Sequence, residues 1–452
     1  MKQTEIGLIP DDWEVKRLGE IGEPCMCKRI LKEQTSPTGD IPFYKIGTFG
    51  GIPDAYISRE LFEQYKEQYN YPKKGTLLLS AAGTIGRVVV FDGKDSYFQD
   101  SNIVWIDNDE TKVTNDFLFY CYSRMQWKTE EGGIVSRLYN ANLKSTSFIA
   151  PKSLAEQERI AKALSDVDAF ISTTEKLIQK KKNIKQGAMQ NLLTGKKRLP
   201  GFGDKQTDLF VPNGTHTKEL KDVSPEQIRL SAKMKQTELG EIPEDWEVKN
   251  INKECTIKAR IGWQGLKSTE YLDSGDYILI TGTDFDSGFI NWKSCSYVTK
   301  WRFDQDKNIQ IKQGDVLITK DGTIGKVAFL NEIPMQGTLN SGVFVIRPKN
   351  PDKMDSVFLS LIFKSFWFDA FLEQITSGST IVHLYQKDFV KFNFPLPSKE
   401  EQTAIANVLS SMDKEIETLN TKLEKYRNLK IAMMQQLLTG KIRLGQGEIN
   451  DR

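Results

Sequence analysis

The chain carries two copies of one sequence pattern, and this repeat constrains its fold more than any other feature. Residues 1–18 read MKQTEIGLIPDDWEVKRL and residues 234–251 read MKQTELGEIPEDWEVKNI, with 13 of 18 positions identical. A second segment, EQERIAKALSDVD…NLLTGKKRL at 156–199, returns as EQTAIANVLSSMD…QLLTGKIRL at 401–444. A solenoid repeats every 20–45 residues or so, far less than the spacing seen here. We therefore expect two domain-sized copies whose divergent middles meet different targets on a common framework.

Composition narrows the class of protein without deciding its function. The 452 residues are 39% hydrophobic and 27% charged, as in a typical globular protein, and the net charge of +2 neither requires nor excludes a polyanionic partner. The most apolar window, 357–375, is interrupted by Lys364, Asp369 and Glu373, which predicts a buried amphipathic helix and no membrane partner. Since no secretory signal is recognisable, we expect reduced cysteines and a cytoplasmic location.

Each copy closes with a predicted long helix, at 154–193 and 399–438. Apolar residues recur there at spacings of mostly four and three, the pattern of a coiled-coil seam. The seam positions are Ile160, Leu164, Val167, Ile171, Ile178 and Leu192 in the first helix, and Ile405, Leu409, Met412, Ile416, Leu419 and Leu423 in the second. We expect the two helices to pair antiparallel, although each could instead pack across its own globular domain. Thr174, Lys181 and Lys185 weaken the first seam, and Lys430 occupies a position of the second.

The divergent middles, 19–150 and 252–396, combine β-strand patterns with shorter predicted helices at 116–127 and 356–372. The sequence thus predicts an α+β protein: two globular mixed α/β domains separated by two long antiparallel helices that form a coiled coil, with an internal pseudo-two-fold repeat. The expected divisions are a first domain at 1–153, a first spacer helix at 154–199, a polar linker at 200–233, a second domain at 234–398 and a second spacer helix at 399–444.

A glycine turn between two β runs recurs in both middles and is a candidate for nucleic-acid contact. Its residues are Gly83, Thr84, Gly86 and Arg87 in the first copy, and Lys320, Gly322, Thr323, Gly325 and Lys326 in the second. The turn does not complete a phosphate-binding loop, which needs a glycine at the place of Lys320, a hydroxyl at that of Val327, and a following helix. A tight hairpin accounts for the glycines, and an approach to a phosphate backbone is compatible with it.

A matching segment precedes each long helix, GIVSRLY at 133–139 and STIVHLY at 379–385. Arg137 and His383 occupy equivalent places there, as do Tyr139 and Tyr385. Because a guanidinium can contact guanine bidentately and an imidazole makes one contact, this difference would suit two domains with different base preferences. The first turn has Ala81-Ala82 where the second has Lys320-Asp321, which is a similar difference in chemistry. Ordinary surface variation remains the alternative for both.

The sequence contains few parts for catalysis. The only histidines are His216 and His383, and no (Asn/Asp)-Pro-Pro-aromatic or Gly-x-Gly-x-x-Gly motif occurs. Asp12-Trp-Glu14 superficially resembles a nuclease motif, but a surface strand with a buried tryptophan explains it better. The basic runs 180–182 and 196–198 suggest solvated helix faces, with phosphate contacts as the alternative. The five cysteines lack the spacing of a zinc site: Cys25, Cys27, Cys121, Cys255 and Cys295.

Taken together, the ordered and duplicated motifs resemble the specificity subunit of Type I restriction–modification systems. The resemblance rests on Ile-Pro-x-Asp-Trp, on Gly-Asp-Val-Leu-Ile…Gly-Thr-Ile-Gly-Lys, on Phe-Pro-Leu-Pro-Ser-Lys-Glu-Glu-Gln and on Leu-Leu-Thr-Gly. It departs at Pro151, where Phe-Ile-Ala-Pro-Lys-Ser replaces the usual Leu-Pro stretch. The family implies two target-recognition domains that each read one half of a bipartite, asymmetric double-stranded DNA target. It also implies paired helices that set the gap and dock two methyltransferase subunits, to which restriction subunits add.

In this family catalysis belongs to the partners, so the resemblance implies a chain that is not an enzyme and binds no metal or cofactor. S-adenosylmethionine, ATP and Mg²⁺ are expected on the partner subunits. Two alternatives stay open: a self-contained nuclease or methyltransferase with an unrecognised site, and a coiled-coil interaction scaffold without a DNA function. The bases read and the gap length cannot be derived from the sequence.

Overall fold

The structure is a computed structural model, and it describes residues 1–125, 127, 137–203, 229–230, 233–286, 288–376 and 383–444. The chain forms two compact units, each assembled from both copies of the repeat. Unit 1 comprises Met1–Lys176 and Thr421–Arg452, and unit 2 comprises Leu177–Asn420. Each unit therefore combines one mixed α/β middle with part of both long helices. Within the described residues, none of the helices has the length and apolar character needed to cross a membrane.

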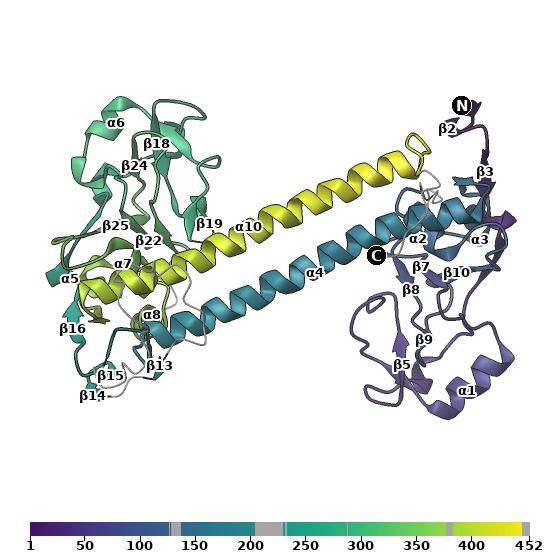
Figure 1. The fold of residues 1–452 in the computed structure, drawn as a ribbon, viewed down its shortest axis with the longest axis horizontal. Coiled ribbons are helices and arrows are strands. Elements are labelled where there is room, and N and C mark those ends of the chain that lie inside the picture. The colour runs from purple at the N-terminus through teal and green to yellow at the C-terminus, as the bar shows by residue number, and fades with distance from the viewer. Residues whose placement is uncertain are drawn as a thin grey trace, which may run out of the picture. The chain divides into compact units, whose positions relative to one another are not determined.

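Unit 1 holds the first mixed region (Figure 1). Its strands are β1 (Lys2–Thr4), β2 (Gly7–Ile9), β3 (Trp13–Arg17), β4 (Gly22–Cys25), β5 (Ile41–Tyr44), β6 (Tyr56–Ile57), β7 (Leu77–Ser80), β8 (Val88–Val90), β9 (Tyr97–Phe98), β10 (Ile103–Asn108) and β11 (Ser147–Pro151). Its shorter α-helices are α1 (Arg59–Gln68), α2 (Asn115–Tyr122) and α3 (Asn140–Ser145).

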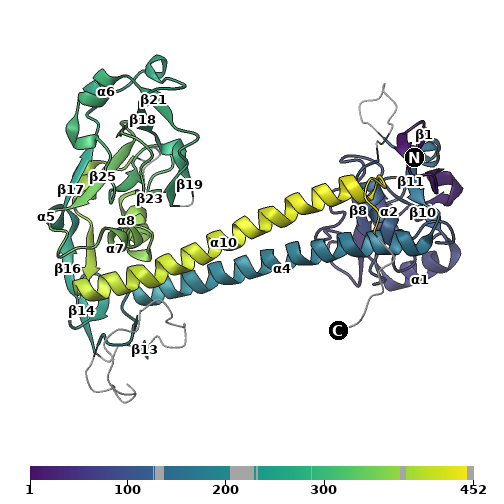
Figure 2. The ribbon, with the colours of Figure 1, turned by 45° about the horizontal axis from the view of Figure 1, so that its top comes forward.

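Unit 2 repeats this plan with additions (Figure 2). Its strands are β12 (Lys197–Arg198), β13 (Arg229–Leu230), β14 (Met234–Thr237), β15 (Gly240–Pro243), β16 (Glu247–Asn250), β17 (Cys255–Ala259), β18 (Tyr277–Ile280), β19 (Phe285–Asp286), β20 (Phe289–Ile290), β21 (Ser296–Val298), β22 (Val316–Thr319), β23 (Val327–Phe329), β24 (Gly337–Leu339), β25 (Val343–Pro348) and β26 (Asn393–Leu396). Its shorter α-helices are α5 (Ile251–Glu254), α6 (Lys300–Asp304), α7 (Ser356–Ile362), α8 (Phe366–Thr376) and α9 (Gln386–Phe389).

The same antiparallel four-stranded sheet forms the centre of each unit. Its strand order is β4-β10-β7-β8 in unit 1 and β17-β25-β22-β23 in unit 2. On one side lies a smaller three-stranded sheet, β6-β5-β9 or β21-β18-β24, which includes one parallel pair. Each unit accordingly has two hydrophobic cores, one between the central sheet and the helices and one towards the small sheet. The predicted combination of α and β structure is confirmed in both copies.

Two of the shorter helices differ from the sequence prediction. The first, predicted at 116–127, ends at Tyr122. The second, predicted at 356–372, is divided into α7 and α8, because the chain turns at Phe363–Ser365 and Ser365 Oγ donates to the Ile362 carbonyl. A side chain that hydrogen-bonds the preceding turn competes with helix continuation. Most of the linker 200–233 lies outside the described residues, as does His216.

The long helices α4 (Leu154–Leu192) and α10 (Lys399–Leu437) match their predicted ranges closely. In both units a buried glutamine one turn into the helix fixes its start. In unit 2 Gln402 donates to the Pro397 and Lys353 carbonyls and accepts from the Asp355 amide, at 2.9, 3.0 and 2.9 Å. In unit 1 Gln157 makes the same three contacts. The repeated Glu-Gln dipeptide at each helix start therefore has a structural reason.

Within each unit the two long helices pair antiparallel. In unit 1 Phe170 of α4 stacks on Tyr426 of α10 with ring centroids 5.5 Å apart, and Lys430 pairs with Asp168 at 2.6 Å. Two of the polar positions that weakened the first seam form ion pairs in unit 2, Lys181 with Glu415 at 2.7 Å and Lys185 with Asp413 at 2.5 Å. Of the predicted seam residues, Ile171, Met412 and Leu419 are half-buried and the rest are buried.

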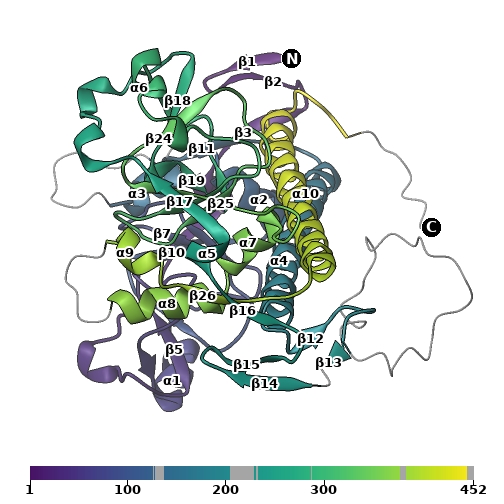
Figure 3. The same cartoon turned by 90° about the vertical axis from the view of Figure 1, so that its left-hand side faces the viewer.

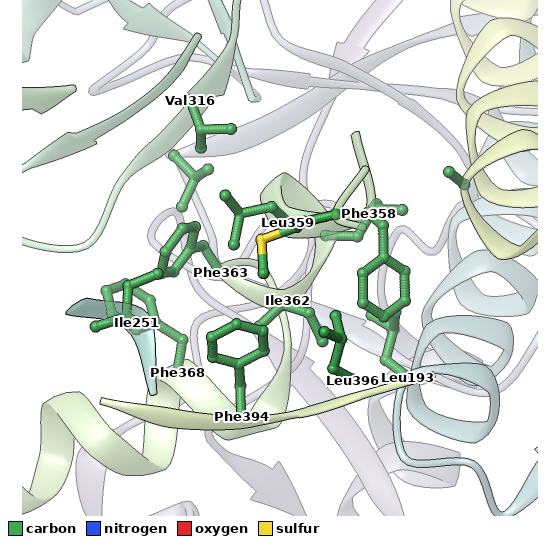
Figure 4. Packing of buried hydrophobic residues seen from close by; sticks show 14 of the residues in the cluster. Leu193, Ile251, Val316, Phe358, Leu359, Ile362, Phe363, Phe368, Phe394 and Leu396 are labelled. Carbon is green, nitrogen blue, oxygen red and sulfur yellow. The ribbon is translucent and has the colours of Figure 1, made fainter. Parts of the chain in front are cut away.

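The segment that follows each long helix is buried in the unit of the other copy. Leu193, at the end of α4, belongs to the core of unit 2 and lies among residues such as Phe358 and Leu396 (Figure 4). Gly195 adopts φ +68° and packs so closely on Pro243 that a Cβ there would lie 2.3 Å from the proline ring. Gly440 adopts φ +66° and packs the same way on Pro10 in unit 1. The two repeated motifs are thus in contact: Leu-Leu-Thr-Gly of each copy packs on Ile-Pro-x-Asp-Trp of the other copy.

An arginine completes this exchange in unit 2. Arg198, in β12 beside β14 and β15 (Figure 3), donates two hydrogen bonds to Glu401 at 2.5 and 2.6 Å and two to Asp245 at 2.9 Å. Glu401 also accepts from Trp246 Nε1 at 3.0 Å. Arg198 is 4% exposed, so the expectation that the basic run 196–198 forms a solvated face is wrong for this residue. Lys196 alone of the three is exposed.

The equivalent arginine of the second copy does the same in unit 1. Arg443 donates to Glu156 at 2.5 and 2.7 Å and to Asp12 at 2.8 and 2.9 Å. Trp13 lies fully buried beside it, which agrees with the sequence interpretation of Asp12-Trp-Glu14 as a strand with a buried tryptophan. Because each arginine comes from the other copy, neither unit is complete without both copies of the repeat.

Candidate nucleic-acid interface

The glycine turns lie between the same two strands of the central sheet in both units. In unit 1 the turn connects β7 to β8, and its Ser80 hydroxyl donates to the Thr84 carbonyl at 2.5 Å and accepts from the Arg87 amide at 2.9 Å. In unit 2 the turn connects β22 to β23, where Thr319 makes the same two bonds at 2.6 and 2.9 Å. The predicted hairpin is therefore present twice, held by one hydroxyl that the sequence analysis did not single out.

Glycine is required in these turns for two physical reasons. Gly83 and Gly86 have φ of +65° and +88°, and Gly322 and Gly325 have +68° and +79°, a region that disfavours other residues. A Cβ on Gly86 would also lie 2.4 Å from the indole of Trp127. The amides of Gly86 and Arg87 are bonded to Ser80, so they are committed to the turn itself. The residues at the tip of the turn, Gly83 and Thr84, are exposed to solvent.

The basic residues of the turns have specific neighbours. Arg87 is exposed but donates through Nη1 to the Phe49 carbonyl at 2.9 Å, which holds its guanidinium against the segment that follows β5. Its counterpart Lys326 is exposed. Lys320 is half-buried, with its ammonium 5.4 Å from the centre of the Phe344 ring.

The segment before α3 and before α9 joins the turn in each unit. The Leu138 amide donates to the Ala81 carbonyl at 2.8 Å, and the Leu384 amide donates to the Lys320 carbonyl at 2.9 Å. This places Arg137 beside the first turn and His383 beside the second, in equivalent positions. The earlier parts of these segments, 133–136 and 379–382, lie outside the described residues.

Arg137 and His383 have different polar neighbours, which the sequence analysis did not connect with them. Arg137 Nη2 donates to Asn102 Oδ1 at 2.6 Å. His383 Nδ1 is in close contact with a carboxylate oxygen of Asp321. The backbone contacts identify the position equivalent to 102: the Ala81 amide donates to the Asn102 carbonyl as the Lys320 amide donates to the Gly342 carbonyl. Asn102 and Gly342 are therefore equivalent.

Two exposed tyrosines flank these side chains. Tyr139 is 49% exposed at the start of α3, and Tyr385 is 53% exposed at the start of α9. The Tyr385 ring lies 4.3 Å from the His383 ring, centroid to centroid, and Lys387 lies above it at 5.4 Å. Exposed aromatic rings beside cations and small turn residues form a surface on which a nucleic acid can pack. Among the described residues, no group of three or more His, Cys, Asp or Glu side chains could hold a metal ion.

The family model described as "Type I restriction modification DNA specificity domain" matches residues 10–186 and 243–425. The chain belongs to this family. Both copies of the repeat are matched, and each match contains one glycine turn and its neighbouring tyrosine. The family fold is thus present twice, as the two central sheets indicate.

Curated specificity subunits show the same relationship along the chain. Two type I restriction enzyme specificity subunits of Methanocaldococcus jannaschii are 27% and 26% identical to it, over 98% and 96% of this chain and 96% and 94% of theirs. A type I specificity subunit of Haemophilus influenzae is 57% identical over 166 residues, which are 37% of this chain and 42% of that protein.

Solved structures agree on the fold. The Type-I restriction-modification S subunit from M. genitalium aligns over 97% of this chain and 98% of its own, with a TM-score of 0.57 and 14% identity. A chain from a structure of the type I R-M system, described in terms of complex assembly, aligns over 96% of this chain with a TM-score of 0.50 and 16% identity. Specificity subunits thus share this arrangement of two mixed domains and long helices at low sequence identity.

Proposed function

We propose that this specificity subunit reads a bipartite, asymmetric sequence in double-stranded DNA, one half-site with each mixed domain. The observation that carries the proposal is the pair of glycine-turn sites, which share one hydrogen-bonded frame and differ in the side chains mounted on it. Equivalent frames suit equivalent approaches to a duplex, and different side chains suit different bases. The interface proposed for each domain consists of the glycine-turn residues and the side chains beside them: Arg137 and Tyr139 in unit 1, and His383 and Tyr385 in unit 2.

We further propose that the paired helices set the gap between the half-sites. Each helix has 39 residues, and a helix rises 1.5 Å per residue, so each is about 58 Å long. Half-sites read from one face of a duplex lie about one helical turn, roughly 34–36 Å, or a multiple of it apart. A helix pair is stiff enough to fix such a spacing. In this proposal 1–153 and 234–398 are the recognition domains, 154–199 and 399–444 the spacers, and 200–233 the linker.

The same helices are proposed to dock two methyltransferase subunits, with restriction subunits added to them. Support comes from the exchange of tails, which gives each unit the same clamp, an Arg paired with a Glu and an Asp beside a buried Trp, so that two copies of one partner can meet equivalent surfaces. Catalysis is assigned to those partners, with S-adenosylmethionine, ATP and Mg²⁺ bound there, and the complex is placed in the cytoplasm.

The decisive experiment is methylation mapping with the complex of this chain and its methyltransferase on unmethylated genomic DNA. Single-molecule sequencing should show one bipartite, asymmetric motif. Replacing residues 19–150 with the equivalent region of a relative should change one half-site and leave the other half-site and the gap unchanged. Methylation or cleavage by the purified chain alone, given S-adenosylmethionine and Mg²⁺, would overturn the assignment of catalysis to the partners. A complex that shows no sequence preference would favour a scaffold without DNA recognition.

A further inference from the structure

The two glycine-turn sites divide into residues that agree and residues that differ. At equivalent positions both sites have a glycine, a threonine and an exposed tyrosine, for example Thr84 with Thr323 and Tyr139 with Tyr385. Features common to all duplexes, the phosphates and sugars, call for the same side chains in both sites. The agreeing residues are therefore suited to contact the DNA backbone.

Besides Ala81 and Lys320, three equivalent positions carry different chemistry on this common frame. They are Ala82 and Asp321 in the turn, Asn102 and Gly342 before the last strand of the central sheet, and Arg137 and His383 beside the turn. The changes are coupled. Arg137 bonds to Asn102, where unit 2 has glycine, and His383 contacts Asp321, where unit 1 has alanine. Each unit thus has one side chain suited to contact a base and one polar neighbour that bonds to it. The neighbour comes from the segment before β10 in unit 1 and from the glycine turn in unit 2.

We propose that Arg137 and His383 read bases, and that Asn102 and Asp321 are positioning residues that determine which base each can accept. This inference rests on the function proposed above and names the residues that give its two domains different preferences. Asn102 or Asp321 acts through the neighbouring side chain, so neither has to touch DNA.

With Asn102 as its hydrogen-bond partner, the Arg137 guanidinium presents only hydrogen-bond donors to a base. A guanidinium has five N–H donors and no acceptor, and one Nη2 hydrogen is used by Asn102 Oδ1 at 2.6 Å. The remaining donors match a base edge that offers only acceptors. In the major groove that edge is guanine, through O6 and N7. We therefore assign guanine to one position of the half-site read by unit 1.

For His383 the partner decides the tautomer. A carboxylate only accepts hydrogen bonds, so Nδ1 in contact with Asp321 carries the proton. When the ring is neutral, Nε2 is then an acceptor and needs a base that presents an amino group, whereas a protonated ring would donate from Nε2. Adenine and cytosine do so in the major groove, through N6 and N4, and guanine does not. For the neutral ring we assign adenine or cytosine to the corresponding position of the half-site read by unit 2.

A graft tests the inference in the complete complex with the methyltransferase. The triple substitution Asp321→Ala, Gly342→Asn and His383→Arg places the unit 1 set on the unit 2 frame. A Cβ at Gly342 would meet its nearest atom, Asp321 Oδ2, at 3.5 Å, an ordinary contact distance, so the backbone there accepts a Cβ. Methylation mapping should show a change to guanine at one position of the unit 2 half-site. The other half-site and the gap should stay the same.

Single substitutions keep the test decisive if the graft prevents assembly. Arg137→Ala should reduce discrimination at one base of one half-site by roughly tenfold to a hundredfold. His383→Ala should do so in the other half-site only, so each variant is the control for the other. Asp321→Asn should relax the His383 position, because an amide can donate as well as accept. Tyr385→Ala should instead weaken binding to all DNA sequences alike.

Each outcome has one meaning. An active graft with an unchanged motif, or alanine variants that methylate the wild-type motif with undiminished discrimination, would overturn the base-reading assignment while leaving the proposed function intact. A wild-type complex without any sequence preference would instead overturn the proposed function. Asp352→Asn, an exposed substitution outside the site, should leave both the motif and the rate unchanged.

Discussion

Arg198 reaches from the tail of the first copy to Glu401, at the first turn of the second copy's helix, with both Nε and Nη2 bonded to its carboxylate. The two side chains are 4% and 2% exposed. In unit 1, Arg443 and Glu156 form the same pair, but there the arginine is 41% exposed. One contact, repeated by the duplication, thus exists in a buried and in a half-exposed form.

The difference in burial predicts unequal stability effects. Arg198→Met removes the partner of a buried carboxylate and should destabilise unit 2 by about 3–5 kcal/mol. Arg443→Met should cost less in unit 1, about 1–3 kcal/mol, because water can approach Glu156 from the arginine side. Amide hydrogen exchange measures the two units separately, because β16 and β26 report the stability of unit 2 and β3 and β11 that of unit 1. Equal protection losses in the two variants would contradict the role given to burial.

The clamp also predicts a pH dependence of stability. The Arg198 guanidinium holds the pKa of Asp245 below its ordinary value of 3.8, so this group's stabilising contribution is complete above about pH 3.8 and is lost as the pH falls through the folded-state pKa. Asp245→Asn should therefore cost about 1 kcal/mol at pH 7, and progressively less below pH 3.8. Urea unfolding between pH 3 and 7 measures this, with Asp352→Asn as the control. A constant difference across this range would count against the ionic contact.

Glu401 should act in the opposite direction. Burial raises its pKa above the ordinary value of 4.5, although Arg198 opposes this shift. A raised carboxyl pKa stabilises the folded state below about pH 4.5, and this contribution is lost as the pH rises through the folded-state pKa. Glu401→Gln should therefore lower the free energy of unfolding more at pH 4 than at pH 7. The same urea series measures it, and a larger loss at pH 7 would show that the ion pair dominates.

The helix pair makes a prediction about pairing specificity. Lys181 and Glu415 form an ion pair at 2.7 Å in unit 2, at the place where Phe170 and Tyr426 stack in unit 1. Lys181→Glu should destabilise the protein by about 0.5–1 kcal/mol through like-charge repulsion, and Lys181→Glu with Glu415→Lys should restore most of it. Thermal unfolding of the two single variants and the double variant gives the coupling energy. Additive effects would show that the two side chains do not interact.

How much of this could be predicted from the sequence depended on the range of the interaction. The heptad spacing placed α4 and α10 to within one residue at their ends, because helix periodicity and the C′ glycines are local signals. The break between α7 and α8 was missed, since both halves are apolar and a serine at the turn is a weak signal. The glycine turns were found from φ-demanding residues in a β context.

The clamp was missed for a different reason. Arg198 and Asp245 are distant in sequence from Glu401, and a basic run at a helix end usually points into water. The available signal was identity between the copies: Arg198 with Arg443, Asp245 with Asp12 and Glu401 with Glu156 are the same residue types in both. Asn102 gave no such signal, because its equivalent is Gly342. Divergent positions become informative only when the hydrogen bonds that make them equivalent are known.

The exchange of tails leads to a last prediction about half of the chain. Residues 1–199 contain Asp12, Glu156 and Arg198, which are all the parts of the clamp, so two such fragments can supply each other's arginine. We expect this fragment to form a two-fold dimer and, with the methyltransferase, to methylate a palindromic motif. Sedimentation equilibrium measures the dimer, and Arg198→Met should shift the fragment towards the monomer.

In this dimer Phe170 would face Lys181 in place of Tyr426. Co-expression with residues 234–452 should therefore favour the pair formed by the two different halves. A strictly monomeric fragment would show that the clamp does not hold two halves together without the linker.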